Sequence, residues 1–233
     1  MMLSVFKSPY TKPLKTQGSQ GRLAHAVVKQ VTDPRDAERE YNMLRVANHE
    51  RVLHAELAPC VLTFPLADCD LLTLLQAGPV QPDAIWRFLA DLRDALYVIH
   101  SRGIVHRDIK LDNVLIFGER AKLGDFGFAT FIEPGEILTE IRGTPGYVAP
   151  EILSREPYDQ KVDVFSFGVC CFAACTRHMP FNKKGPTAEI PSPVKAVWDA
   201  LDISDARRTA VDASLRFRPS ERASSLDLAR ISL

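Results

Sequence analysis

Residues 103–117, GIVHRDIKLDNVLIF, constrain the fold of this chain more than any other stretch. The apolar runs at 104–105 and 114–117 have the composition of buried strands. Between them lies a set of polar side chains, namely His106, Arg107, Asp108, Lys110, Asp112 and Asn113. Charged groups removed from water are costly unless they are paired or have a function. The segment therefore predicts a polar loop with a chemical role between two buried strands.

Overall composition excludes several classes of function. The chain has 233 residues, enough for one large domain or two small ones, and its 29 basic residues balance its 29 acidic residues. Nothing in this balance indicates binding to nucleic acid or to an anionic membrane. The most apolar segment, 164–175, is too short to span a bilayer, so we expect a helix buried on all sides and no membrane span.

Cysteine and histidine usage indicates a reduced, intracellular protein. The five cysteines lack CxxC spacing and cannot all pair, and the six histidines are too scattered to suggest a zinc site. Residues 1–15 lack the apolar core of a signal peptide.

Strand patterns dominate before about residue 66, and helical patterns follow. Strands are predicted at 3–6, 23–31, 52–57 and 60–64. This segregation predicts an α+β chain with a small, mostly β lobe (about 1–66) joined to a larger helical lobe (about 67–233).

Helix boundaries have clear signals. Asp33 and Pro34 are the residue types of an N-cap and a first helical turn, and the helix that they begin is predicted to reach about Ala47. Another helix is expected from about Asp70. A long amphipathic helix runs from residue 82 to the glycine at 103.

Five motifs follow one another along the chain, and together they identify a family. They are HRDIKLDN (106–113), GDFG (124–127), GTPGYVAPE (143–151), DVFSFG (163–168) and RFRP (216–219). In content and order they resemble the eukaryotic-type protein kinase family, and the resemblance covers nearly the whole chain. It implies one kinase domain over 1–233 with a bilobal fold, in which a reduced antiparallel β small lobe joins a mainly helical large lobe. The short length is similar to that of compact, virus-encoded members.

The resemblance implies roles for the charged residues, because phosphoryl transfer depends on positioning and charge neutralisation. Asp108 would accept or orient the proton of a substrate hydroxyl, and Lys110 would steady the γ-phosphate. Lys29 would contact the α- and β-phosphates and pair with Glu40 on the following helix. A strand-end surface lysine is the alternative for Lys29, and the inward glutamate downstream disfavours it.

The resemblance also implies a site for ATP and Mg²⁺. Asn113 and Asp125 would hold the metal, since magnesium takes oxygen ligands. A hinge at 65–67 would bind adenine through the carbonyl of Pro65 and the N–H of Ala67. Asp70 lies where a ribose contact is expected.

Lys110 and the GTPGYVAPE segment resemble the serine/threonine class, so the expected partners are protein substrates with serine or threonine acceptors. Asp112 either selects basic residues upstream of the acceptor or is a solvated surface acid. We expect a monomer in the cytoplasm or nucleus, of the host cell if the chain is virus-encoded. The alternative function is a pseudokinase, a scaffold that keeps the fold to bind partners.

Three contacts are expected to support the site. The resemblance makes the polar loop of residues 106–113 the catalytic loop. Glu151 and Arg218 match a buried ion pair, Asp163 would hold the backbone of this loop, and Thr144 would contact it.

One family feature departs from its usual form. The family carries Gly-x-Gly-x-x-Gly over the phosphates, whereas the glycines before Lys29 here are those of GSQG at 18–21. Too few residues follow GSQG for two strands, which favours it as the turn between the second and third strands. SPYTKP at 8–13 would then cover the phosphates, and its prolines predict weak nucleotide affinity. The alternative keeps GSQG over the phosphates.

Glu140 occupies the position, four residues before Thr144, where many family members have a phosphothreonine that pairs with the arginine before the catalytic aspartate, here Arg107. A carboxylate at 140 can accept this guanidinium bidentately without modification. The alternative is that Glu140 is a solvated acid and Thr139 is the phosphosite.

Overall fold

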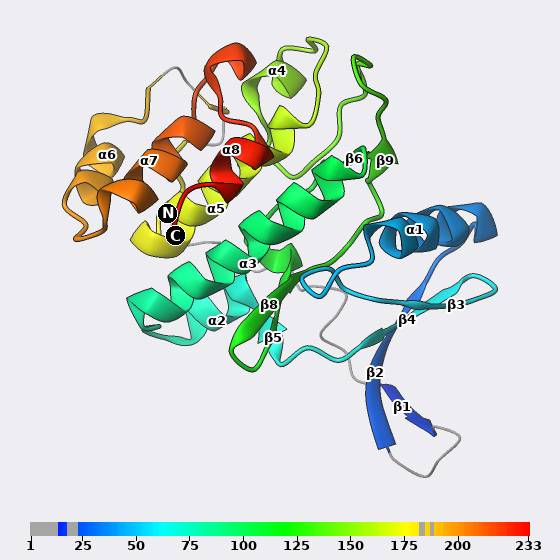
Figure 1. Cartoon of the computed structure of the whole chain (residues 1–233). Helices are drawn as coiled ribbons and strands as arrows, with labels where there is room; N and C mark the ends of the chain where they lie inside the picture. Colours follow the sequence, from blue (N-terminus) through cyan, green and yellow to red (C-terminus); the bar gives the residue numbers. More distant parts are fainter. Residues whose placement is uncertain (1–13, 18–22, 182–184, 187–188) are drawn as a thin grey trace.

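The computed structural model describes residues 14–17, 23–181, 185–186 and 189–233, with side chains from residue 26 onward. Figure 1 shows a sheet and one helix at the lower right and a larger helical body at the upper left. This arrangement agrees with the predicted bilobal α+β fold. In the described part of the chain, no helix is long and apolar enough to cross a membrane.

The small lobe contains an antiparallel sheet with the strand order β1-β2-β4-β3. Its strands are β1 (Leu14–Gln17), β2 (Leu23–Gln30), β3 (Glu56–Ala58) and β4 (Val61–Pro65). β1 and β2 pair so that Gln17 faces Leu23. GSQG at 18–21 lies between these two strands in the chain, outside the described residues. The strand predicted at 3–6 and the turn predicted at 8–13 lie outside the described residues.

The strand predicted at 52–57 is wrong over residues 52–55, and only residues 56–57 belong to β3. Val52 forms only an isolated bridge to Leu123, at the end of β8 (Arg120–Leu123), and the N–H of Leu53 donates to the Leu123 carbonyl at 2.8 Å. Both Val52 and Leu53 are fully buried. Their apolar character therefore reflects packing of the small lobe against the large lobe.

Helix α1 (Pro34–Ala47) begins and ends where the sequence predicts. The Asp33 carboxylate accepts the N–H of Arg35 at 2.9 Å, and a proline opens the first turn. The buried face of the helix carries Glu40 together with Ala37, Met43, Leu44 and Ala47. A carboxylate on an apolar face needs a partner, and β2 provides it.

The large lobe is assembled around α5 (Lys161–Thr176), which is buried on all sides as predicted. The surrounding helices are α2 (Leu71–Ala77), α3 (Pro82–Ser101), α4 (Pro150–Leu153), α6 (Ser192–Asp199), α7 (Asp205–Ser214) and α8 (Ser225–Ala229). Aromatic side chains fix α5 to its neighbours, because Phe165 stacks on Phe181 and Phe172 stacks on Trp198, with ring centroids 5.7 and 5.3 Å apart.

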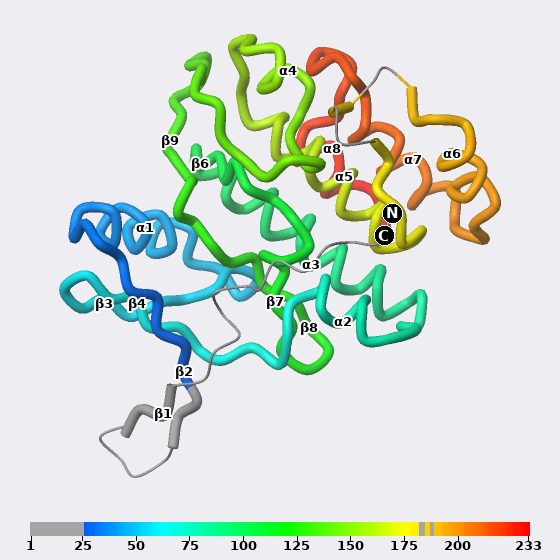
Figure 2. The backbone as a smooth tube through the Cα atoms, turned by 180° about the vertical axis from the view of Figure 1, so that it is seen from behind, coloured from blue at the N-terminus to red at the C-terminus, as the bar shows by residue number. Residues whose placement is uncertain are grey.

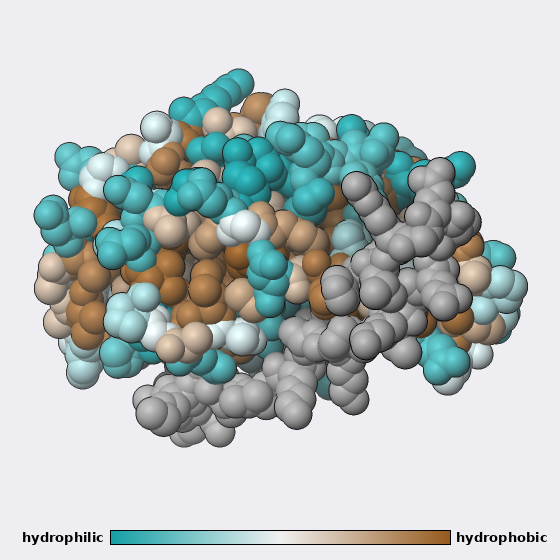
Figure 3. Space-filling model, turned by 90° about the horizontal axis from the view of Figure 1, so that it is seen from below, coloured by the Kyte–Doolittle hydropathy of each residue, from teal (hydrophilic) through white to brown (hydrophobic). Residues whose placement is uncertain are grey.

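The outer surface is chemically mixed. Figure 3 shows the molecule from below, where apolar side chains lie in patches among polar ones. Such mixing is ordinary for a folded protein, because polar residues are too few to cover the whole surface.

Short strands hold the polar loop of residues 106–113. β6 (Ile104–Val105) pairs with β9 (Thr130–Phe131), and β7 (Val114–Phe117) lies between β8 and β5 (Cys69–Asp70). Figure 2 shows β6 and β9 side by side near α1. Both apolar runs of the opening motif are therefore strands, and the loop between them ends in a short 3₁₀ helix, η2 (Leu111–Asn113).

Glu151 forms a buried ion pair as predicted, but the prediction that Arg218 is its partner is wrong. Glu151 pairs with Arg222 through two contacts of 2.6 and 3.0 Å, whereas Arg218 is exposed and lies 3.6 Å from Glu221. A 3₁₀ helix, η3 (Pro219–Glu221), separates the two arginines. It directs Arg222 inward, where its guanidinium also donates to the carbonyl of Lys161 at 2.9 Å.

We expect Arg222→Ala to lower the free energy of unfolding by about 3–5 kcal/mol, because it leaves the buried Glu151 carboxylate unpaired. Arg218→Ala is the matched control and should change it by less than about 0.5 kcal/mol. Urea unfolding measures both values. Equal losses in the two variants would show that the pair with Arg222 does not stabilise the fold.

Candidate active site

The backbone of the polar loop is held by Asp163, as the sequence predicts. The N–H groups of His106 and Arg107 donate to its two carboxylate oxygens at 2.7 and 2.8 Å, and Nε2 of His100 lies 3.0 Å from one of them. Burial raises the pKa of Asp163, but the hydrogen bond and charge of His100 outweigh burial and lower the pKa below its ordinary value. A buried anion thus anchors the loop to α5.

Asp108 lies at the centre of a hydrogen-bonded cluster. Lys110 Nζ donates to Oδ2 at 2.7 Å, and the Thr144 hydroxyl donates to Oδ1 at 2.6 Å. Nδ2 of Asn113 donates to the Asp108 carbonyl at 2.8 Å, and among the described residues nothing donates to the Asn113 Oδ1 atom. The predicted contact of Thr144 with the loop is therefore confirmed, and the side-chain oxygen of Asn113 accepts no hydrogen bond from the described residues.

Lys29 joins the two lobes electrostatically. Its ammonium lies 3.0 and 2.8 Å from the Glu40 carboxylate oxygens and 2.8 Å from Asp125 Oδ1. The Glu40 side chain is 4% exposed, whereas those of Lys29 and Asp125 are each 22% exposed. The lysine is therefore no strand-end surface residue.

One ammonium shared by two carboxylates leaves one negative charge in excess. Burial raises the pKa of Glu40 and outweighs the opposing charge of Lys29. Burial also raises the pKa of Asp125, but Lys29 outweighs it there and lowers the pKa. The lowered pKa favours the ionised form of the Asp125 carboxylate.

The segments that carry Asn113 and Asp125 lie beside each other. The N–H of Gly124 donates to the carbonyl of Asn113 at 2.9 Å, and its own carbonyl lies 3.0 Å from His106 Nε2. The ring of Phe126 packs edge-on against His106, with centroids 4.8 Å apart. Between these anchors Asp125 has a φ of 58°, a left-handed conformation that is uncommon outside glycine. Strained backbone of this kind is frequent at functional sites.

A comparison with known families matches residues 21–230 to the protein kinase domain. The chain belongs to the protein kinase family. This confirms the resemblance inferred from the motifs.

Similar curated proteins are named as serine/threonine kinases. They include serine/threonine-protein kinase 36 from Pongo abelii, 34% identical over 63% of this chain and 12% of that protein. CBL-interacting serine/threonine-protein kinase 2 from Arabidopsis thaliana is 32% identical over 62% of this chain and 34% of that protein. Serine/threonine-protein kinase unc-51 from Caenorhabditis elegans is 34% identical over 54% of this chain and 15% of that protein. The match therefore covers between 12% and 34% of the length of these relatives.

The predicted hinge of this kinase-family chain follows β4. Pro65 ends that strand, and Ala67 is 9% exposed, with an N–H that donates to no carbonyl of the described residues. Asp70 has a contact that the sequence does not predict, because its carboxylate caps α2 through the N–H and hydroxyl of Thr73 at 2.8 and 2.9 Å. The contact of Asp70 with ribose stays a prediction.

Asp112 is 8% exposed, so its interpretation as a solvated surface acid is wrong. Burial raises the pKa of its carboxyl group, and the charges of Asp70 and Asp108 act in the same direction. Whether it selects basic residues in a substrate stays a prediction.

The sequence analysis does not predict two further charged contacts, those of Asp91 and Arg102. Asp91 is 2% exposed and lies on the apolar face of α3, between Phe88 and Ala95. Its carboxylate accepts hydrogen bonds from Arg120 and forms an ion pair with Arg51 at 2.9 Å. An acid in an otherwise apolar helical stripe is the signal that identifies it.

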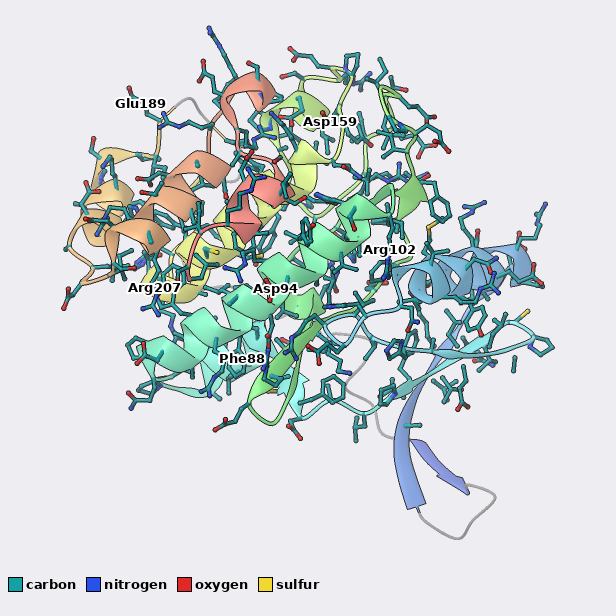
Figure 4. The ribbon with its side chains drawn as sticks, viewed as in Figure 1. Phe88, Asp94, Arg102, Asp159, Glu189 and Arg207 are labelled. Atoms are coloured by element: carbon teal, nitrogen blue, oxygen red, sulfur yellow. The ribbon has the colours of Figure 1, made fainter. Side chains whose placement is uncertain are left out.

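The position of α1 depends on a contact at its end. Arg102, labelled in Figure 4, follows α3 and donates to the carbonyls of Val46 and Asn48 at 2.9 and 3.2 Å. This contact links the C-terminal end of α1 to the large lobe, and α1 carries Glu40.

We expect Glu40→Gln to reduce activity without reducing stability. Because the pKa of Glu40 is raised in the folded state, the stability that it contributes falls as pH rises from its ordinary pKa through the raised one. At pH 7 the amide removes that penalty, so the free energy of unfolding should stay the same or rise by up to about 1 kcal/mol. The kcat/KM for ATP should fall at least about ten-fold, because Lys29 loses a partner that orients it.

Urea unfolding and steady-state kinetics measure the two effects. The exposed Glu38, on the same helix, provides the control Glu38→Gln. A destabilised Glu40→Gln variant with unchanged kcat/KM would contradict the assignment of Glu40 as the residue that orients Lys29.

Proposed function

We propose that the chain is an ATP-dependent serine/threonine protein kinase, with the whole of 1–233 as one kinase domain whose small lobe ends near residue 66. One observation carries the proposal. Asp108 accepts a hydroxyl hydrogen bond from Thr144 beside the ammonium of Lys110, and this cluster adjoins the segment of Asp125 and Lys29. A base, cationic groups and metal-ligand oxygens are the parts that phosphoryl transfer needs.

In the proposed reaction, Asp108 accepts or orients the proton of a serine or threonine hydroxyl of a protein substrate. Its Oδ1 atom already accepts a hydrogen bond from the Thr144 hydroxyl, which supports this role. Lys110 would steady the γ-phosphate. Lys29, held by Glu40, would contact the α- and β-phosphates.

Asn113 and Asp125 would hold Mg²⁺. The Asn113 amide nitrogen is used by the Asp108 carbonyl, and Lys29 contacts only one of the Asp125 oxygens, so each residue offers an oxygen suited to a hard cation. When bound, magnesium supplies neutralisation of phosphate charge.

The adenine ring would lie at the hinge against the Pro65 carbonyl and the Ala67 N–H, with Asp70 near the ribose. Each Asp70 oxygen accepts one hydrogen bond from Thr73 and keeps a lone pair for a ribose hydroxyl. We further propose that the protein is intracellular and monomeric. The five free cysteines support an intracellular location, because disulfides are rare in reducing compartments.

The alternative of a pseudokinase scaffold requires the fold but not the catalytic side chains. Lys29, Asp108, Asn113 and Asp125 are all present, and each makes hydrogen bonds within the site. A chain released from catalysis has no physical need for this arrangement, which supports the enzyme.

Asp108→Asn should lower kcat by about 10²–10⁴-fold, because it removes a proton acceptor. The Kd for ATP should be unchanged, since Asp108 has no proposed nucleotide contact. Transfer of radiolabelled phosphate to a generic protein substrate measures turnover, and the exposed Asp202 provides the control Asp202→Asn. Equal turnover in Asp108→Asn and the parent would exclude Asp108 as the base.

Asp125→Asn should weaken binding of ATP in the presence of magnesium at least about ten-fold, because it removes a charged metal ligand. Binding of ATP in excess EDTA should change much less. Calorimetric titrations under the two conditions measure the difference. Equal weakening with and without magnesium would contradict the proposed metal role.

A further inference from the structure

The segment that precedes Thr144 is attached to the loop between α4 and α5. Leu138 and Tyr158 form an isolated antiparallel bridge, with N–H···O distances of 2.8 and 2.9 Å in the two directions. The Tyr158 hydroxyl also donates to the carbonyl of Glu140 at 2.6 Å. Since Tyr158 is 3% exposed, these hydrogen bonds are shielded from competing water.

The side chain of Glu140 makes a second attachment. Its Oε2 atom lies 3.1 Å from Arg107 Nη1 and 3.4 Å from Arg142 Nε. Hydrogen bonds from Arg107 and Arg142 lower the pKa of Glu140 below its ordinary value. Instead of the expected bidentate pair with Arg107, the carboxylate bridges two arginines through one oxygen, and the Arg107 Nε–H donates to the Phe128 carbonyl at 2.7 Å.

The attached segment continues into the catalytic cluster. A Cβ placed on Gly143 would lie 3.0 Å from the Arg107 carbonyl, so the backbone packs closely on the catalytic loop there. The next residue, Thr144, donates to Asp108. The conformation of residues 138–143 therefore determines whether Thr144 contacts Asp108, the proposed base.

We propose that Tyr158 and Glu140 are positioning residues, and that the contacts of Leu138 and Glu140 with Tyr158 and Arg107 hold residues 138–144 in the competent arrangement without phosphorylation. We name these four residues the clasp. The inference rests on the proposed function, because it concerns the regulation of the same site. Its consequence is that the unmodified chain turns over substrate.

The two attachments differ in strength. The Glu140 side chain is 59% exposed, and exposed ion pairs contribute little. The Tyr158 hydroxyl and the two backbone hydrogen bonds are formed by a buried residue and are less accessible to water. We therefore expect the clasp to depend more on Tyr158 than on the charge of Glu140. A phosphate on Thr139 would add charge one residue before a carboxylate that already contacts two arginines.

The first test measures activity after expression in a bacterial host that lacks protein kinases of this family, followed by phosphatase treatment. The parent and Thr139→Ala should remain active. Tyr158→Phe removes one hydroxyl and should lower kcat/KM for the protein substrate by about 3- to 10-fold, with an unchanged Kd for ATP. Glu140→Gln should lower it by about 2- to 5-fold, and Glu140→Asp should retain part of the lost activity.

A purely structural role would lower the Tm and weaken ATP binding together with activity. The control is Tyr97→Phe, on an exposed tyrosine of α3, which should change neither quantity. Loss of activity on phosphatase treatment, or Tyr158→Phe and Glu140→Gln variants that equal the parent, would overturn the proposal.

A second measurement does not depend on catalysis. Hydrogen exchange of the Leu138 amide in the unmodified parent should be protected, and Tyr158→Phe should accelerate it by about 3- to 10-fold while Tyr97→Phe does not. If the parent has no transferase activity, the proposed function fails and this measurement still decides the clasp. Unprotected exchange at Leu138 in the parent would overturn the inference even if the protein is an active kinase.

Discussion

A single buried carboxylate supports the geometry of the site. Asp163, on the completely enclosed α5, accepts the backbone N–H groups of His106 and Arg107 and is paired with His100. Buried N–H groups without acceptors are costly, so the loop could not enter the interior without this residue. Since α5 packs against α3 and α7, the rigidity of the core is transmitted to the loop, and Asp108 takes its place one residue later.

The contact between the two lobes depends on the ammonium of Lys29, which two carboxylates share. Lys29 of β2 contacts Glu40 of α1 and Asp125 of the large lobe, and the two carboxylates exceed the one ammonium. Excess negative charge in a partly buried place is unfavourable for the protein alone. It is compatible with the proposed magnesium site, and this local conflict with stability is typical of functional sites.

Much of the fold could be predicted because its signals are local. Asp33 and Pro34 defined the start of α1, and the alternation of apolar runs and polar residues defined β6, β7 and the loop between them. Motif order was sufficient to identify the family and to select Asp108, Asn113 and Asp125 as candidates. The strand predicted at 52–57 was wrong over residues 52–55 because an apolar pattern indicates burial without naming the element that covers it.

The sequence by itself determined the element types, most helix boundaries and the residues that carry the proposed chemistry, since caps, turns and hydrophobic periods depend on neighbours within one or two turns. Only the tertiary structure decided which partner each buried charge has. Glu151 pairs with Arg222 instead of Arg218, Asp70 caps α2, and the Tyr158 hydroxyl donates to the backbone of Glu140. These choices depend on which distant segments approach within about 3 Å, the range of a hydrogen bond, and no local pattern encodes that approach.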